Sequence, residues 1–162
     1  MLIDVRGTRL HVDQRGAKDA PPLLYLHGGP GSGSHDFMSF QGERLSERLR
    51  LVGVDQRGVQ RSDPLDGPVT EDDLIADFEA LREVLGFERW SILGHSYGGR
   101  LALLIKGGHD PVTSPEEISL FRECVPNGTF RLFESAGHFV HAEEAEEYAR
   151  LVAAFVVGEV TR

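Results

Sequence analysis

The 162-residue sequence contains little cysteine, few basic residues and no long apolar run. Cys124 is the only cysteine, which excludes an internal disulfide and favours a reducing compartment. No apolar run approaches the ~20 residues that span a bilayer. The first residues, MLIDVRGTRLHV, lack the charged and apolar regions of a signal peptide. We therefore expect a cytoplasmic protein with no membrane partner.

The charge balance is acidic, with 26 Asp and Glu against 17 Lys and Arg and a formal net charge of −9. Nucleic acids and anionic membranes require a concentrated basic surface, so both are disfavoured as partners. Much of the acid lies in residues 71–86 and 141–150, where it is typical of solvated helix faces. The length and the 40% hydrophobic content predict a single globular domain over residues 1–162.

Two kinds of strand pattern occur in the first hundred residues. Residues 2–16 alternate apolar and polar side chains around Gly7, which predicts a β-hairpin. Residues 21–29, 48–58 and 89–96 instead contain short continuous apolar runs, as in strands covered on both faces of a parallel sheet. Each run ends in Gly with His or Asp nearby, which places polar chemistry at the carboxyl ends of these strands.

Helical spacing separates these strands. Residues 37–49 and 70–86 carry apolar side chains at helical intervals, and the second segment starts at Thr70, with Asp73 three residues later, and ends at Gly86. Alternation of strand and helix predicts right-handed βαβ units in a mostly parallel, doubly wound α/β sheet. The remaining expected elements are strands at 103–108 and 128–135 and helices at 114–125 and 141–157.

The segment GHSYGG, residues 94–99, fits the pattern G-x-S-x-G directly after a strand. This pattern is typical of a serine nucleophile on a strained turn, where side chains in place of Gly94 and Gly98 would collide with neighbouring backbone. Ser96 is then the nucleophile. The N–H of Tyr97, at the start of a helix, would donate to the oxyanion that forms. The alternative is a glycine-rich turn whose serine caps a helix.

The segment HGGPGSG, residues 27–33, follows another expected strand and is the second glycine-rich turn. An oxyanion hole needs a second backbone donor, and we assign it to Gly29 because Pro30 has no N–H. A phosphate-binding loop is the competing interpretation, but no G-K-[ST] follows.

Together, HGGPG, DQRGVQRSD and GHSYGG, in this order and spacing, resemble the α/β-hydrolase superfamily, and most closely its proline iminopeptidase group. The resemblance covers residues 1 to about 104 and resumes at about 103 to 162. It implies an α/β-hydrolase core with an N-terminal β-hairpin, no metal and no cofactor. It also implies the chain order nucleophile, acid, histidine. Asp110 in KGGHDPV matches the acid, and His138 in ESAGHFVHAEE matches the base.

Several other residues compete for these roles. His141 is close to His138, but its HAEE setting is typical of the first turn of a helix. Asp55 and Asp63 are alternative acids, although a carboxylate at the end of the strand in DQRG more simply ties its turn together. His27, Gly28 and His95 are candidates for lining the substrate pocket, and a ring hydrogen bond within its own loop is the simpler role for His27.

The sequence departs from the family in three places. Gln60 replaces the second Gly of D-Q-R-G-x-G, and Tyr97 stands where the aminopeptidases usually have Trp. Only 13 residues separate Ser96 from Asp110. Family members place a helix, a strand and a helical cap between these groups, so a segment is missing near residues 100–105. A parallel crossover normally needs a dozen or more residues.

We therefore expect a serine hydrolase of small esters, amides or short peptides, most like an N-terminal proline aminopeptidase. A carboxylesterase of the same fold is one alternative. The other is a non-catalytic core without a cap that acts as a binding or dimerising module. A homodimer formed by exchange of segments around residues 97–106 would also accommodate the short middle.

Overall fold

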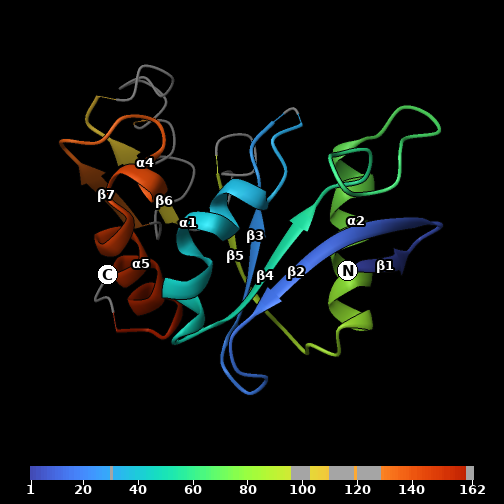
Figure 1. Ribbon diagram of the computed structural model, residues 1–162, viewed down its shortest axis with the longest axis horizontal. Helices are drawn as coiled ribbons and strands as arrows, with labels where there is room; N and C mark the ends of the chain where they lie inside the picture. The colour runs from blue at the N-terminus through green and yellow to red at the C-terminus, as the bar shows by residue number, and fades with distance from the viewer. Residues whose placement is uncertain (30, 96–102, 110–118, 120–128, 160–162) are drawn as a thin grey trace.

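The computed structural model describes residues 1–29, 31–95, 103–109, 119 and 129–159 (Figure 1). The strands are β1 (Leu2–Val5), β2 (Thr8–Arg15), β3 (Pro22–Leu26), β4 (Arg50–Asp55), β5 (Ser91–Gly94), β6 (Leu103–Gly107) and β7 (Thr129–Phe133). The helices are α1 (His35–Ser46), α2 (Glu71–Val84), α4 (Val140–Glu143) and α5 (Ala145–Val156). All expected strands are confirmed. The helix expected at 114–125 lies outside the described residues except for Ser119.

Five strands form a mixed sheet in the order β1-β2-β4-β3-β5. The hairpin β1–β2 is antiparallel and turns at Arg6 and Gly7, whose φ angles of 45° and 79° favour glycine at the second position. Strand β2 pairs antiparallel with β4, whereas β3 pairs parallel with both β4 and β5. The N-terminal hairpin and the parallel strands agree with the sequence patterns.

Helices cover both faces of this sheet, which explains the continuous apolar runs. On one face Leu23, Tyr25 and Leu51 pack in a buried cluster with residues of α1 and α5. On the other face Leu24 and Val52 pack in a second cluster with residues of α2. Alternate residues of β3 and β4 thus enter different cores, as expected for the central strands of a doubly wound sheet.

Helix α2 begins and ends as its sequence predicts. The Thr70 hydroxyl accepts the N–H of Asp73, and the Asp73 carboxylate accepts the N–H of Thr70, which forms a capping box. Beyond the last helical turn, Gly86 has a φ of 75°, in the left-handed region that terminates many helices.

Strands β6 and β7 form a separate, parallel two-stranded sheet. Within the described residues β5 pairs with β3 and not with β6, so the sheet is divided between these two strands. Only residues 95–102 separate Gly94 from Leu103. These eight residues are too few to supply a further helix and strand between them. The short middle of the sequence lies at the point where the described strands divide into two sheets, and the missing segment stays a prediction.

The C-terminal region differs from the single helix expected at 141–157. Helix α4 ends at Glu143, Glu144 has φ −122° and ψ 48°, and α5 begins at Ala145. The Glu143 carboxylate accepts backbone N–H groups of the preceding loop, and the Glu144 carboxylate accepts the Ser135 hydroxyl. These local bonds compete with a continuous helix, and the apolar periodicity alone did not reveal them.

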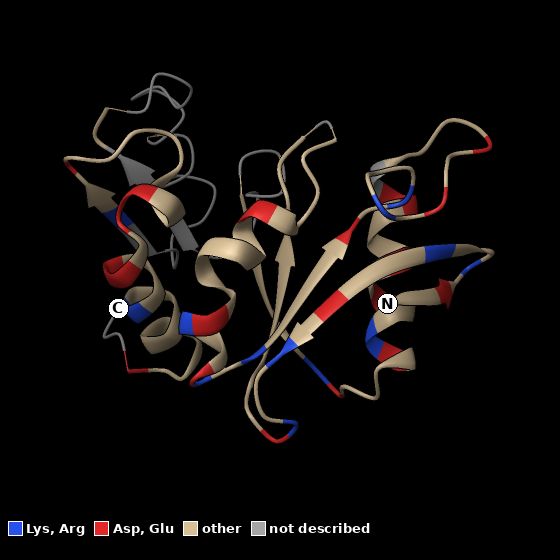
Figure 2. Cartoon of the chain, in the orientation of Figure 1, with Lys and Arg blue, Asp and Glu red and all other residues tan. Residues whose placement is uncertain are grey.

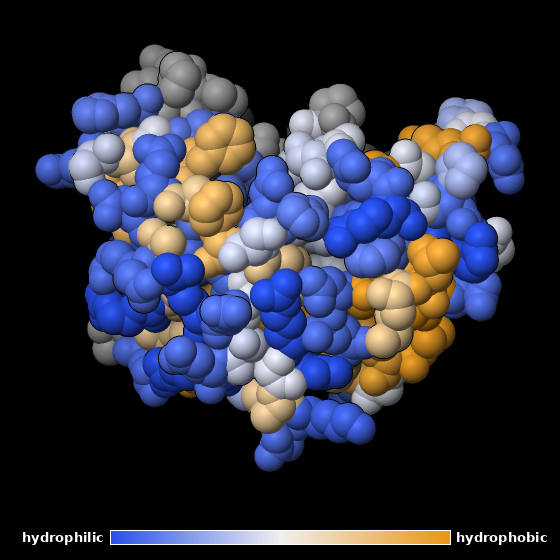
Figure 3. Space-filling model, in the orientation of Figure 1, coloured by the Kyte–Doolittle hydropathy of each residue, from blue (hydrophilic) through white to orange (hydrophobic). Residues whose placement is uncertain are grey.

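The surface carries charges of both signs, with basic residues scattered along the chain (Figure 2). On the face shown in Figure 3, apolar residues gather over β1 and α2 at the right and over α1 and α4 at the left. In the second area Phe40 and Phe139 are 47% and 55% exposed. None of the helices in the described part of the chain is long and apolar enough to cross a bilayer.

Candidate active site

The chain segments that follow β5, β6 and β7 lie close together. The Gly108 N–H, just after β6, donates to the Phe133 carbonyl at the end of β7 over 2.6 Å. The next N–H, of His109, donates to the Ala136 carbonyl over 2.9 Å. Because β6 and β7 are parallel, these bonds join their carboxyl ends, where ligands bind in open α/β sheets.

Three imidazoles form a cluster at this edge. The His95 ring, directly after β5, lies 5.1 Å from the His138 ring and 5.2 Å from the His141 ring, centroid to centroid. The Phe139 ring packs edge-on against His138 at 5.3 Å and lies 5.8 Å from His95. The cluster therefore connects the end of β5 to the loop that follows β7.

The residues predicted for catalysis divide into two groups. His138 and His95 are described and are partly buried. Ser96, Tyr97 and Asp110 lie outside the described residues. Their immediate neighbours are informative, because His95 precedes Ser96 and its ring lies beside that of His138.

The acid has a similar neighbour. His109 precedes Asp110, and its N–H is bonded to Ala136, two residues before His138. The loop that carries His138 thus contacts both His95, the residue before Ser96, and His109, the residue before Asp110. The triad itself remains a prediction.

His141 occupies a different environment from His138. It lies in α4, as the HAEE pattern predicts, and is 6% exposed beneath Phe40 and Phe139, which pack edge-on against its ring. Burial, together with the nearby His95, lowers the pKa of His141 to about 4. A covered imidazole of such low basicity is poorly suited to remove a proton at neutral pH.

His27 links the first glycine-rich turn to the DQRG turn. Its Nε2 accepts the N–H of Gln56 over 3.2 Å, so Nδ1 carries the hydrogen and donates to the Gly28 carbonyl over 2.7 Å. Burial lowers the pKa of His27, which disfavours the protonated ring. The expected ring hydrogen bond is confirmed. Gly28 is buried, whereas Gly29, the predicted oxyanion donor, is exposed.

Gln60, which replaces a family glycine, adopts the conformation that a glycine would favour. Its φ is 47°, in the left-handed region that costs most side chains about 1 kcal/mol or more. Its side-chain amide donates to the Gly31 carbonyl over 2.9 Å. Gln60 therefore strains the backbone of the DQRG turn, and its side chain links this turn to the glycine-rich turn that contains Gly31.

The alternative acids Asp55 and Asp63 are engaged in ion pairs. The buried Asp55 carboxylate accepts Arg61 Nε over 2.7 Å and both the N–H and the hydroxyl of Ser34. Burial would raise the pKa of Asp55, but these donors lower it to about 2. Asp63 pairs with Arg9 Nε over 2.8 Å. Asp55 thus ties its turn together, as its position predicted.

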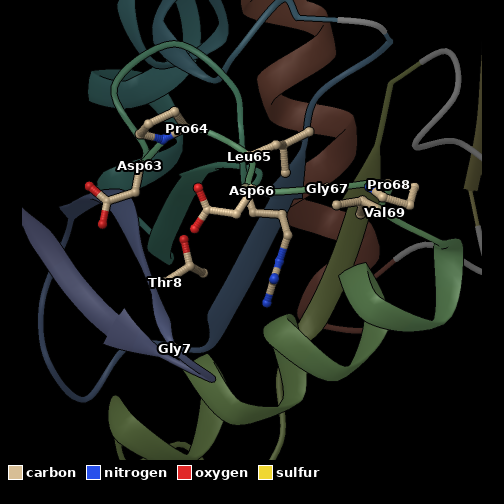
Figure 4. A pocket seen from close by; sticks show the side chains of 10 residues that line it. Gly7, Thr8, Asp63, Pro64, Leu65, Asp66, Gly67, Pro68 and Val69 are labelled. Carbon is tan, nitrogen blue, oxygen red and sulfur yellow. The ribbon is translucent and has the colours of Figure 1, made fainter.

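A cavity of about 290 Å³ lies away from the imidazole cluster, between the β1–β2 turn and residues 63–69 (Figure 4). Arg57 lines it, but both its Nε and an Nη donate to the buried Asp77 over 2.6 Å, so its charge is balanced. The alternative acid Asp63 lines this cavity, whereas the described residues His95 and His138 do not.

Comparison with known proteins identifies the family. A family model for the alpha/beta hydrolase fold matches residues 21–105, more than half of the chain. The chain belongs to the α/β-hydrolase family. The matched region includes β3, β4 and β5 with the glycine-rich sequence segments that follow β3 and β5.

Curated relatives of this α/β hydrolase are proline iminopeptidases. The chain is 36% identical over 170 residues to that of Xanthomonas citri, covering 96% of this chain and 52% of the relative. It is 40% identical over 126 residues to that of Xylella fastidiosa strain 9a5c, covering 76% of this chain and 37% of the relative. The α/β hydrolase therefore spans about half the length of the curated relatives it matches, or less, and is proline iminopeptidase-like.

Solved structures agree on the fold. A variant of the meta-cleavage product hydrolase CumD superposes with a TM-score of 0.87 at 14% identity, over 99% of this chain and 98% of that chain. The esterase EaEST from Exiguobacterium antarcticum superposes with a TM-score of 0.84 at 16% identity, over 97% of this chain and 99% of the esterase chain. At such identities these structures establish the α/β-hydrolase fold alone.

Two features of the site were not foreseen from the sequence. One is the packing of three imidazoles against each other, since His95, His138 and His141 were each considered separately. The other is the role of Glu143 beneath the His138 loop. Despite the imidazole cluster, no group of three or more His, Cys, Asp or Glu side chains within the described ranges could hold a metal ion.

Proposed function

We propose that the chain is a serine hydrolase that cleaves esters, small amides or short peptides through an acyl-enzyme. Ser96 is the nucleophile, His138 the general base and acid, and Asp110 the carboxylate that orients His138. The N–H groups of Gly29 and Tyr97 bind the oxyanion. The observation that supports this assignment most directly is the 5.1 Å separation between the rings of His138 and His95, the residue before Ser96.

The reaction has two steps. The Ser96 hydroxyl oxygen attacks the carbonyl carbon while its proton passes to the His138 imidazole, and the carbonyl electrons collect on the oxyanion. The bond to the leaving group then breaks, and His138 returns the proton to the departing alcohol or amine. In the second step water attacks the carbonyl carbon of the acyl-enzyme while His138 takes a proton from the water. His138 then gives this proton to the Ser96 oxygen as the ester bond breaks, and the acid is released.

The relatives favour a substrate with an N-terminal proline, because those matched over most of this chain are proline iminopeptidases. An esterase is the closest alternative within the same mechanism. The short connection between β5 and β6 leaves no room for the cap that family members carry there. We therefore expect a more open site, which weakens substrate selection.

A fluorophosphonate probe tests the mechanism, because it labels only a serine that is activated for attack. We expect covalent labelling of the wild type and none of Ser96→Ala. Labelling should fall by about 10³-fold or more in His138→Ala, since the serine hydroxyl is inert without a base. The matched control His141→Leu should retain labelling. An unlabelled but folded wild type would favour the non-catalytic binding or dimerising module.

Two classes of reporter substrate then separate peptidase from esterase. A proline iminopeptidase should have a higher kcat/KM for L-proline β-naphthylamide than for the β-naphthylamides of alanine or leucine. Hydrolysis of p-nitrophenyl acetate without any proline preference would instead support the esterase.

A further inference from the structure

Glu143 holds the loop that carries His138 through two hydrogen bonds. Its Oε2 accepts the N–H of Gly137 over 2.8 Å, and its Oε1 accepts the N–H of Phe139 over 3.2 Å. These are the residues immediately before and after His138. One carboxylate therefore fixes the peptide groups that flank the predicted base.

This arrangement extends beyond ordinary helix capping. Helix α4 has four residues, and its N-cap, Phe139, has no side-chain cap of its own. A carboxylate from the helix that accepted only the Phe139 N–H would be a local cap. The second bond, to Gly137, lies outside the helix. Hydrogen bonds to a charged acceptor contribute about twice as much as neutral ones, so this pair restrains the loop effectively.

The loop also approaches the carboxylate closely. A Cβ on Gly137 would lie 3.2 Å from Glu143 Oε1 and 3.4 Å from Oε2, closer than most such contacts. The break at Glu144 ends α4 directly after Glu143, and the Glu144 side chain bonds Ser135 at the start of the same loop. Two consecutive glutamates thus contact this loop, but only Glu143 brackets His138.

We propose that Glu143 is a positioning residue for His138. This inference rests on the proposed function, because it assigns the carboxylate the task of holding the catalytic base in register with Ser96. Glu143 itself bonds peptide N–H groups and acts on the reaction through His138. Displacement of a catalytic group by about 1 Å can lower the rate of the chemical step by about 100-fold.

The test compares Glu143→Ala and Glu143→Gln with the matched control Glu144→Ala. In Glu143→Ala we expect the rate of fluorophosphonate labelling and kcat to fall by about 10-fold to 100-fold, with KM changed by less than about 3-fold. Glu143→Gln retains one acceptor oxygen and should recover part of the loss. Glu144→Ala should remain within about 2-fold of the wild type.

A readout independent of activity is the amide proton shift of Gly137 and Phe139 in NMR spectra. Loss of a charged acceptor should move both resonances upfield in Glu143→Ala and leave them in place in Glu144→Ala. A folded Glu143→Ala protein with wild-type kcat, or equal losses in both alanine variants, would overturn the positioning role. An unreactive wild type would overturn the proposed function, while the amide shifts would still decide whether Glu143 holds the loop.

Discussion

At the scale of single residues, burial divides the histidines into different chemical classes. His141 is enclosed by α4, α5 and α1 and contacts Phe37 and Tyr148 as well as the other imidazoles. Removing its protonated form from water costs free energy that its neighbours do not return, so its pKa falls from 6.5 to about 4. His138, three residues earlier, is partly exposed and keeps the access to substrate that a base requires.

The pKa of His141 makes stability depend on pH. Because the folded-state pKa lies below that of the unfolded chain, the unfolded chain binds the proton first. The free energy of unfolding should therefore fall as pH drops from 6.5 toward about 4, by about 3 kcal/mol from this residue. Chemical denaturation at several pH values in this range measures the unfolding free energy. This free energy should depend less on pH in His141→Leu than in the wild type. The same dependence of unfolding free energy on pH in both proteins would contradict this expectation.

At the scale of elements, one buried side chain joins α1 to the C-terminal helices. Gln41 on α1 is fully buried, and its side-chain NH₂ donates to the carbonyls of His141 in α4 and Ala145 in α5, the latter over 3.0 Å. These carbonyls flank the break at Glu144, where the helical hydrogen-bond pattern is interrupted. Gln41 thus supplies the His141 carbonyl with a donor that a continuous helix would have supplied itself.

Substitution of Gln41 tests this connection. Gln41→Leu conserves much of the volume but leaves the His141 carbonyl at the break without its donor, so we expect a loss of about 1–3 kcal/mol of unfolding free energy. Ser39→Ala on the same helix removes an exposed bond within α1 and should cost less than about 0.5 kcal/mol. Urea denaturation of both variants measures the difference. Similar losses of unfolding free energy in the two variants would show that the Gln41 bonds to the C-terminal helices contribute little to stability.

At the scale of the whole molecule, the division between β5 and β6 separates the fold into two unequal parts. The five-stranded sheet has a core on each face, whereas β6 and β7 form a two-stranded sheet that is marginally stable alone. Ala136, Val140 and Tyr148 pack into the core cluster that includes α1. This packing joins the C-terminal part to the rest, since β5 and β6 share no strand pairing in the described coordinates.

Hydrogen exchange should reveal this division. Amides of β3 and β4, in the centre of the larger sheet, should exchange at least about 100-fold more slowly than those of β6 and β7, which can open without unfolding the larger sheet. Exchange measured at low denaturant concentrations distinguishes the two parts. Equal protection in both sheets, with the same denaturant dependence, would mean that the molecule opens as one unit.

Local patterns were enough to predict much of this architecture. The hairpin at Gly7, the capping box at Thr70 and the end of an apolar run at Gly94 depend on neighbouring residues, so the sequence predicted them directly. The role of Asp55 was also predictable, since a carboxylate at the end of a strand lies beside the turn it stabilises. The site could be outlined because each proposed group follows a strand whose carboxyl end faces the same edge.

The α/β-hydrolase family and the order of its strands, helices and glycine-rich segments could be predicted from the sequence alone, because these follow from local patterns. The contact of His95 with His138 and the enclosure of His141 became apparent only in the folded structure. So did the return of Glu143 to the loop and, among the described residues, the pairing of β6 with β7 and not with β5. These features depend on which distant segments pack against each other, and neither periodicity nor spacing along one chain specifies that packing.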